Sequence, residues 1–532
     1  MMAYHHTFSM VRFIVRQDRF RLFIWLFSLV TASLAIASAF TNLYASEAER
    51  QSMAQTLANP AMTAMLGPGY GLDNYTEAAM MAHQMLLFTA VVVAVMNILL
   101  TARHTRSPEE DGRLEMLRAL PYGRLSQLSA ALIVMAGVNL LLALITGFGL
   151  YAIGIESMDL QGSLLYGAVL GGAGLFFAAV TAVLAQLSES ARGTLGLSFA
   201  VLGLAYLMRA IGDVSSEALS WLSPLGWAVR TEAYVNNHWG PLFLLLVVAL
   251  FMIALSLRLQ SIRDLGAGFL PARLGRKEAS AYLRGPFTLA MRLQRTAMIS
   301  WLVAMVLIGA SYGSVLGDVE TFFSSNEMIR EMFASDGGGP VTEQFISVIM
   351  LVIAMIAAVP AILALFKLKG EERKNRNEHV LARAVSRYRQ FGSYVVLALL
   401  VSAVMMLSAG WTLAAAGAAV MEEPVSVGEL AAAALAYVPA LFVMVGLGAL
   451  VMGVFPRATG LIWLYLVYAF VVNYFGGLFQ FPEWAAQLTP FGHVPQLPLE
   501  EMDYTAVGLL SLIAALLLFV GFQGFRKRDM YG

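Results

Sequence analysis

The chain has 532 residues, of which 59% are hydrophobic and only 13% are charged. Soluble domains carry about a quarter charged residues, so this composition excludes an ordinary soluble globular protein. The 34 basic and 34 acidic residues leave no net charge that would point to nucleic acid, and the absence of cysteine excludes disulfides, thiolate metal sites and cysteine nucleophiles.

Apolar runs long enough to cross a bilayer, about 20 residues each, recur along the whole chain. A transmembrane β-barrel would instead alternate apolar and polar residues over segments of about ten residues. We therefore expect an all-α polytopic membrane protein with about 12 transmembrane helices. The predicted spans are 21–41, 77–101, 126–153, 162–187, 193–212, 239–260, 297–317, 342–368, 391–420, 427–454, 457–478 and 505–525.

The two halves of the chain repeat the same order of features. Amphipathic segments at 7–20 and 284–296 interleave apolar residues with arginine, which favours an interfacial helix before the first span of each half. Short turns that contain Pro and Gly, at 223–227 and 489–493, follow the fifth span of each half. This order predicts an internal duplication.

Six spans in each half would give the two halves the same orientation, as parallel repeats. We expect a first six-helix half at 1–265, a cytoplasmic linker at 266–283 and a second six-helix half at 284–532. Almost all of the 34 Lys and Arg residues lie in the termini and in the loops on one side of this arrangement. The positive-inside bias makes that side cytoplasmic, so both termini are expected in the cytoplasm.

The densest charged segment, 107–124, lies between the second and third spans and reads SPEEDGRLEMLRALPYGR. Acidic residues open it, Leu and Met alternate with Arg and Glu through its middle, and Pro121 closes it. This pattern predicts a short amphipathic helix over 111–121. A solvated loop helix without a partner is the alternative interpretation.

A weaker copy of this segment follows the eighth span, at 369–389. It keeps Glu371, Glu372 and Glu378, but its glycine is replaced, the spacing to Glu378 is one residue longer, and Pro121 has no counterpart. We therefore expect the two segments to differ as docking surfaces.

The chain carries no recognisable source of energy or catalysis. None of its five lysines completes a phosphate-binding loop, there is no H-E-x-x-H motif, and carboxylates within the spans are scarce. The spacing of Arg209 and Asp213 predicts a local i,i+4 ion pair. We therefore expect no enzyme activity, metal or cofactor in this chain, and an energy source in a partner.

The order of interfacial helix, first span, loop, second span and charged helix resembles permease subunits of type-2 ATP-binding-cassette exporters. The resemblance is closest to the duplicated antibiotic (tetronasin or polyketide-type) subfamily. It implies that the charged segment is a coupling helix that docks on a separate ATPase subunit. The residues concerned are Glu109, Glu110, Asp111, Gly112, Arg113, Glu115, Leu117, Arg118 and Pro121, with Glu371, Glu372 and Glu378 in the second half.

The same resemblance implies the rest of the expected mechanism. Two ATPase copies would bind ATP and Mg²⁺ and serve one permease in a bacterial plasma membrane. The permease would export a hydrophobic or amphipathic compound, such as an antibiotic, a drug or a lipid, by alternating access. The second and fifth spans of each half would line the transport path.

Few residues mark a cargo path. Polar side chains within the apolar runs are the candidates, and hydrogen bonding between helices is the alternative for each of them. They are His83, Gln84, Asn97, Gln344, Asn473 and Tyr474.

Two other functions stay open. The segment 264–277 faintly resembles a loop motif of major-facilitator transporters, which are also twelve-span proteins, although that motif belongs between the second and third spans. The chain could also be a scaffold or sensor that docks an ATPase without moving cargo. A neighbouring ATPase gene would disfavour the facilitator, and ATP-dependent transport would exclude the scaffold.

Overall fold

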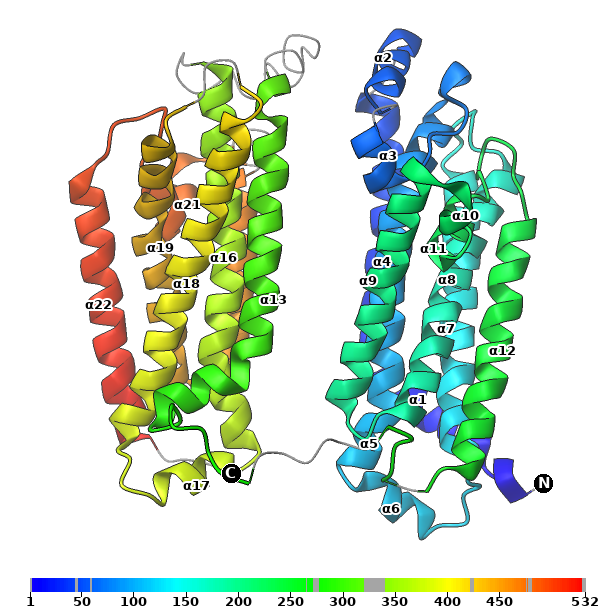
Figure 1. Ribbon diagram of the computed structural model, residues 1–532, viewed down its shortest axis with the longest axis horizontal. Helices are drawn as coiled ribbons and strands as arrows, with labels where there is room; N and C mark the ends of the chain where they lie inside the picture. Colours follow the sequence, from blue (N-terminus) through cyan, green and yellow to red (C-terminus); the bar gives the residue numbers. More distant parts are fainter. Residues whose placement is uncertain are drawn as a thin grey trace. The chain divides into compact units, whose positions relative to one another are not determined.

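The computed structural model describes residues 2–43, 46–57, 60–264, 266–270, 277–319, 340–421, 425–474, 476 and 481–528. Contacts divide the chain into two compact units, residues 1–275 and 276–532, each a bundle of long helices in Figure 1. All regular elements of the described residues are helical, and eleven helices are long and apolar enough to cross a membrane. The all-α class is confirmed, whereas the predicted limits of the linker stay a prediction.

Six long helices form the first unit. They are α1 (Thr7–Leu43), α4 (Glu77–His104), α7 (Ser126–Ala152), α8 (Leu160–Leu187), α9 (Ala191–Ser215) and α12 (Gly240–Ile262). The short helices α5 (Arg106–Glu110) and α6 (Arg113–Arg118) lie at one end of the unit, which we call the α6 end. The opposite end, which we call the α10 end, carries α2 (Glu47–Leu57), α3 (Pro60–Leu66), α10 (Glu217–Ser220) and α11 (Pro224–Val229) (Figure 1).

Helix α8 is the centre of the first unit and contacts α4, α7, α9 and α12. Glycines permit its close approach to α7: a Cβ on Gly171 would lie 2.5 Å from the carbonyl oxygen of Asn139, and one on Gly174 would lie 2.0 Å from its side-chain oxygen. Without a hydrophobic effect in lipid, such close packing of small residues is a main source of helix association. The glycines therefore fix the α7–α8 interface.

The second unit repeats this arrangement. Its long helices are α13 (Pro286–Val315), α16 (Val341–Arg373), α18 (Arg387–Ala418), α19 (Val427–Val454) and α22 (Tyr504–Lys527), and the shorter ones include α17 (Arg376–Leu381), α20 (Leu461–Tyr474) and α21 (Glu483–Gln487). The pairs α1–α7, α7–α8, α4–α8 and α8–α12 have the counterparts α13–α18, α18–α19, α16–α19 and α19–α22. The predicted repeat is therefore visible in the helix pairing, whereas the same membrane orientation of the two units stays a prediction.

Within the described residues, the helix of the expected span at 457–478 is shorter than predicted. Its helix, α20, has 14 residues and follows a 3-10 segment at Pro456–Gly460. At a rise of 1.5 Å per residue, such a helix is about 21 Å long, which is less than the roughly 30 Å of a bilayer core. Residues 475 and 477–480 of this span lie outside the described residues.

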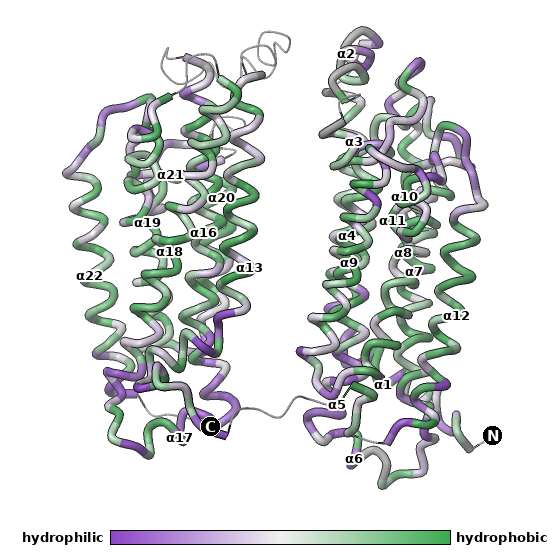
Figure 2. The backbone as a smooth tube through the Cα atoms, in the orientation of Figure 1, coloured by the Kyte–Doolittle hydropathy of each residue, from purple (hydrophilic) through white to green (hydrophobic). Residues whose placement is uncertain are grey.

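The expected interfacial segments are joined to the first span of each unit. Segment 7–20 is the start of α1, which bends at Asp18 (φ −110°, ψ 16°), and 284–296 falls almost entirely within α13. Figure 2 shows hydrophobic residues along the middle of the long helices and hydrophilic residues toward their ends. This distribution fits helices that cross a bilayer.

Candidate coupling site

The predicted coupling segment forms two short helices rather than one. Helix α5 ends at Glu110, and α6 covers only Arg113–Arg118 of the predicted 111–121 helix. Gly112 separates them with a left-handed backbone (φ +72°), a conformation that glycine adopts without steric cost. The glycine in the sequence motif therefore makes the turn that presents α6.

The second unit builds the same turn with a different residue. Helix α16 ends at Arg373, α17 begins at Arg376, and Asn375 between them has φ +54°. Asparagine is one of the few residues other than glycine that visits the left-handed region, because its short side chain can hydrogen-bond locally. Asn375 therefore takes the place of Gly112, one residue later in the copy.

Glu109 is buried in an ion-pair network instead of facing outward. Its Oε2 lies 2.9 Å from Nη1 of Arg106 and 2.8 Å from Nη2 of Arg263, and the three side chains are 1–4% exposed. Its Oε1 accepts a hydrogen bond of 2.7 Å from the backbone N–H of Gly266. Glu109 therefore positions the segment and is not available to a docking partner.

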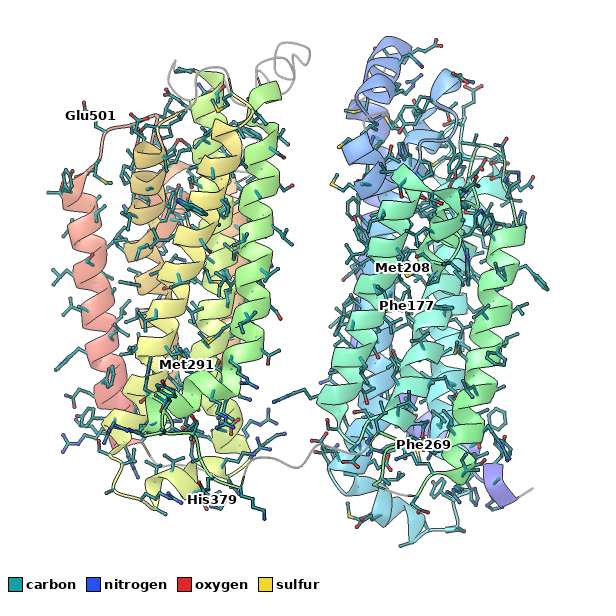
Figure 3. The ribbon with its side chains drawn as sticks, in the orientation of Figure 1. Phe177, Met208, Phe269, Met291, His379 and Glu501 are labelled. Atoms are coloured by element: carbon teal, nitrogen blue, oxygen red, sulfur yellow. The ribbon has the colours of Figure 1, made fainter. Side chains whose placement is uncertain are left out.

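The two arginines also hold the chain that follows α12. Arg106 donates to the carbonyl oxygens of Gly266 and Ala267, and Arg263 donates to Ala267 and to Oε1 of Gln186 at the end of α8. The backbone N–H of Leu270 donates to Leu187 O at 2.8 Å. Phe269, labelled in Figure 3, lies at the same end of the unit. The coupling segment, α8 and α12 are thus joined at the α6 end.

A related bridge exists in the second unit. Arg528 follows α22 as Arg263 follows α12, and its Nη2 lies 2.5 Å from Oε1 of Glu372. Glu371 pairs with Lys367 at 3.1 Å and with Arg376 at 3.6 Å. In both units, an arginine directly after the last helix therefore binds a glutamate of the charged segment.

The N-terminal residues hold the far end of the first segment. Nδ1 of His5 lies 3.0 Å from the carbonyl oxygen of Pro121, and the carbonyl oxygen of His5 accepts from Gly123 N at 3.1 Å and from Ser126 Oγ at 2.6 Å. The contact with His5 thus holds Pro121, near the end of the segment, against the N-terminal residues.

Asp18 holds the other end of the segment, where α4 leads into α5. At the bend of α1, its buried carboxylate lies 2.7 Å from Nε2 of His104 and 2.9 Å from Nε of Arg103. Both partners are in the last turn of α4, immediately before α5. The bend of α1 is therefore tied to the point at which α4 leads into the coupling segment.

Most other charged side chains of the first segment face outward, whereas Leu114 is buried. Glu110, Asp111, Arg113 and Glu115 are exposed, and so are the apolar side chains of Met116 (69%) and Leu120 (53%). Glu110 also accepts from the backbone N–H of Ala191 at 2.8 Å, at the start of α9, and Arg113 pairs with Asp111 at 3.1 Å. The side chains of Leu117 and Arg118 lie outside the described residues.

The corresponding surface of the second unit has the opposite charge. Glu378 is exposed among basic neighbours, and His379, labelled in Figure 3, is exposed on α17. The exposed basic residues are Arg373, Lys374, Arg376 and Arg383. No residue of α17 matches the exposed apolar pair Met116 and Leu120, since Val380 and Leu381 are only partly exposed.

Most of the predicted cargo residues make internal hydrogen bonds. Asn97 on α4 and Asn139 on α7 exchange two amide hydrogen bonds, of 3.0 and 2.7 Å. Nδ2 of Asn473 donates to Ala469 O at 2.7 Å and to Thr489 Oγ1 at 2.8 Å. The contact between α4 and α7 matches the interhelical alternative for Asn97, whereas Asn473 bonds its own helix and the turn at Thr489.

The other four candidates differ from one another. His83 binds Tyr75 Oη at 2.8 Å and Gly67 O at 3.1 Å, and it borders a small cavity at the α10 end. Gln84 has a buried amide nitrogen without a hydrogen-bond partner in the described residues. Gln344 is buried, and Tyr474 stacks on Phe470 with 5.2 Å between ring centroids. The structure does not gather the six residues into one site within either unit.

Comparison with known proteins identifies the family. The family model described as "Multidrug efflux system permease Rv1217c, C-terminal domain" matches residues 9–259 and 283–526. The chain belongs to this permease family. It is also 36% identical over 533 residues to the multidrug efflux system permease protein Rv1217c of Mycobacterium tuberculosis (strain ATCC 25618 / H37Rv). This alignment covers 98% of this chain and 95% of that protein. The permease part of the resemblance is confirmed, and the antibiotic subfamily stays a prediction.

Three residues of this permease site were not singled out from the sequence. In the sequence, Arg106 and Arg263 are simply basic residues at the ends of apolar runs, and Asn139 is a single amide within a predicted span. An available signal for Arg263 was its place directly after the last span of a repeat, which Arg528 shares.

Proposed function

We propose that this chain is the transmembrane permease subunit of an ATP-driven exporter. It moves a hydrophobic or amphipathic compound, such as an antibiotic, a drug or a lipid, out of a bacterial cell by alternating access. A separate ATP-binding-cassette subunit, in two copies, supplies ATP hydrolysis with Mg²⁺. Both termini and the α6 end face the cytoplasm in this proposal, and the α10 end faces outward.

The observation that carries the proposal is the way the coupling segment is held. Its buried side joins α4, α8 and α12 through Glu109, Arg106 and Arg263, while Met116 and Leu120 remain exposed on its outer side. Exposed apolar side chains ringed by charges are typical of the centre of a protein interface. A segment anchored in this way can transmit displacement to the helices, which a loosely solvated loop cannot.

Helix α4 is the direct route for that displacement. It runs from the α10 end to His104, and only Thr105 separates it from α5, which begins at Arg106. The contact of Asp18 with Arg103 and His104 also joins α1 to the helices that would move with α4. A partner that pulls on α6 therefore acts on α1, α4, α8 and α12 together.

The test is to replace the exposed apolar pair by Met116→Glu together with Leu120→Glu. We expect the tagged double variant to insert normally in native membranes but to lose a co-purifying ATPase subunit and its ATP hydrolysis. This pair is a sharper choice than Glu110, because Glu110 also caps α9 through Ala191. Tyr282→Glu, at a side chain that is 85% exposed outside this surface, is the matched control and should keep the partner.

Retention of the ATPase by the double variant would contradict the coupling role of α6. Export that continues without any ATPase and collapses with the proton gradient would favour a facilitator. A docked ATPase without cargo movement would favour the scaffold.

A further inference from the structure

A group of basic and aromatic side chains lies at the end of the second unit that carries α17. It consists of Arg387, Tyr388 and Arg389 at the start of α18 and of Arg526 and Lys527 at the end of α22. Figure 1 shows these two helix ends at the same end of the unit, and all five side chains are exposed. We call the five residues the Tyr388 cluster.

Contacts between α18 and α22 hold the cluster together. Nη1 of Arg387 donates to the carbonyl oxygens of Arg526 and Arg528, at 3.1 and 3.0 Å. The guanidinium of Arg526 lies over the ring of Tyr388, 5.6 Å from its centroid. That ring also stacks on Phe522, with 6.3 Å between centroids. The cluster is therefore a built surface in which an aromatic ring lies beside fixed cations.

The positive charge of the cluster is not balanced by carboxylates. Its four cations form no ion pair within the described part of the chain, because Glu372 pairs with Arg528 at 2.5 Å and Glu371 pairs with other basic residues. The start of α13 adjoins the cluster, since a Cβ on Gly285 would lie 3.5 Å from Nη2 of Arg389. Three helix ends thus meet at a surface with an excess of positive charge.

The first unit provides an internal comparison. Arg124, before α7, donates to the carbonyl oxygen of Arg263, as Arg387 donates to that of Arg528. Counted from these equivalent hydrogen bonds, the first unit has Leu125, Ser126, Ser261 and Ile262 where the second has Tyr388, Arg389, Arg526 and Lys527. The hydrogen bond is therefore part of the repeated fold, whereas the fold does not require the other four residues of the cluster.

The cluster lies next to the predicted spans 391–420 and 505–525. Its residues are within about four positions of these apolar runs, which is about 6 Å along a helix. That is the level of lipid headgroups, where tyrosine is enriched and where basic side chains contact anionic lipid. Arginine suits such a site because its paired N–H groups match the oxygens of a phosphate.

We propose that the Tyr388 cluster binds the headgroup of an anionic phospholipid, of the phosphatidylglycerol class. Its unbalanced cations complement the phosphodiester, and the exposed ring of Tyr388 packs against the glycerol and the upper part of an acyl chain. A zwitterionic headgroup binds more weakly, because its own ammonium group cancels part of the attraction. The inference goes beyond the proposed export function and does not depend on an ATPase.

The test is native mass spectrometry of the purified full-length chain in detergent, with added dioleoyl phosphatidylglycerol or dioleoyl phosphatidylcholine. We expect the first bound phosphatidylglycerol to have the lower dissociation constant. Arg389→Gln together with Arg526→Gln should weaken its binding about thirtyfold. Arg389→Lys together with Arg526→Lys keeps the charges and should keep the preference for phosphatidylglycerol, which separates loss of charge from loss of folding.

The matched control is Arg192→Gln together with Arg258→Gln, which removes two exposed charges from the first unit and should leave the binding unchanged. Equal dissociation constants for the two lipids, or an unchanged constant in the Arg389 and Arg526 glutamine variant, would overturn the cluster as a lipid site. Loss of a co-purifying ATPase from that variant with lipid binding unchanged would also overturn it, because the surface would then dock a protein. The lipid measurement contains no ATPase, so its failure would leave the coupling role of α6 intact.

Discussion

Arg263 and Glu109 form a buried ion pair, with 2.8 Å between Nη2 and Oε2, across a separation of 154 residues. The pair joins the end of the last helix of the first unit to the start of the coupling segment. An arginine that would otherwise serve only to orient a span is thus a structural tie between α12 and α5.

Glu109→Gln should destabilise the first unit, because it leaves Arg106 and Arg263 as buried charges without a carboxylate. Removal of one partner of a buried ion pair costs about 3–5 kcal/mol, so a clear drop in the thermal unfolding midpoint is expected. Glu115→Gln, at an exposed position of the same segment, should change that midpoint little. Equal midpoints for the two variants would refute the structural role of Glu109.

The turn residues predict an asymmetric response to substitution. Gly112→Ala forces a left-handed backbone on alanine at a cost of about 1–2 kcal/mol, although its Cβ would contact nothing within 4 Å. Asn375→Gly should be tolerated, since glycine adopts the same conformation. ATPase co-purification should therefore weaken in the first variant and persist in the second, and the reverse order would contradict the assigned turns.

The α7–α8 interface predicts which glycines tolerate a methyl group. Gly174→Ala places a Cβ 2.0 Å from the side-chain oxygen of Asn139 and should cost about 1–3 kcal/mol through overpacking. Gly137→Ala, on α7 and with open space around it, is the matched control and should be neutral or stabilising. Thermal unfolding in nanodiscs distinguishes the two, and a tolerant Gly174 would mean that the helices lie farther apart.

The proposed orientation is open to direct labelling, because the chain has no native cysteine. Glu156→Cys, beyond α7 toward the α10 end, should react with a membrane-impermeant maleimide in intact cells. Tyr282→Cys, in the predicted cytoplasmic linker shortly before α13, should react only after permeabilisation. The opposite pattern would invert the topology and place α6 outside the cell.

The long helices and their repeat could be predicted from the sequence because both signals are local or periodic. A run of apolar residues specifies a span by itself, and the turns after the fifth spans recur as α11 and as a 3-10 segment at Pro490–His493. The predicted end of the span at 478 came from the apolar run in the sequence, whereas α20 ends at Tyr474 within the described residues.

The interior of the candidate site could not be predicted in the same way. Whether Glu109 faces a partner or Arg263 depends on the contact of segments 154 residues apart, which no local pattern reports. The structural role of Asn97 depends on its hydrogen bonds with Asn139, which lies 42 residues later on another helix. Sequence position predicts that the charged segment couples to a partner, but three-dimensional contacts decide which of its side chains remain free.

In the proposed mechanism, ATP hydrolysis on a partner moves cargo through this permease by way of α6. Proteoliposomes that contain the chain and its ATPase, loaded with a fluorescent hydrophobic dye, test it most directly. We expect dye movement that requires ATP, is unaffected by dissipating the proton gradient, and is abolished by Met116→Glu with Leu120→Glu. ATP-independent movement, or full activity in the double variant, would contradict it.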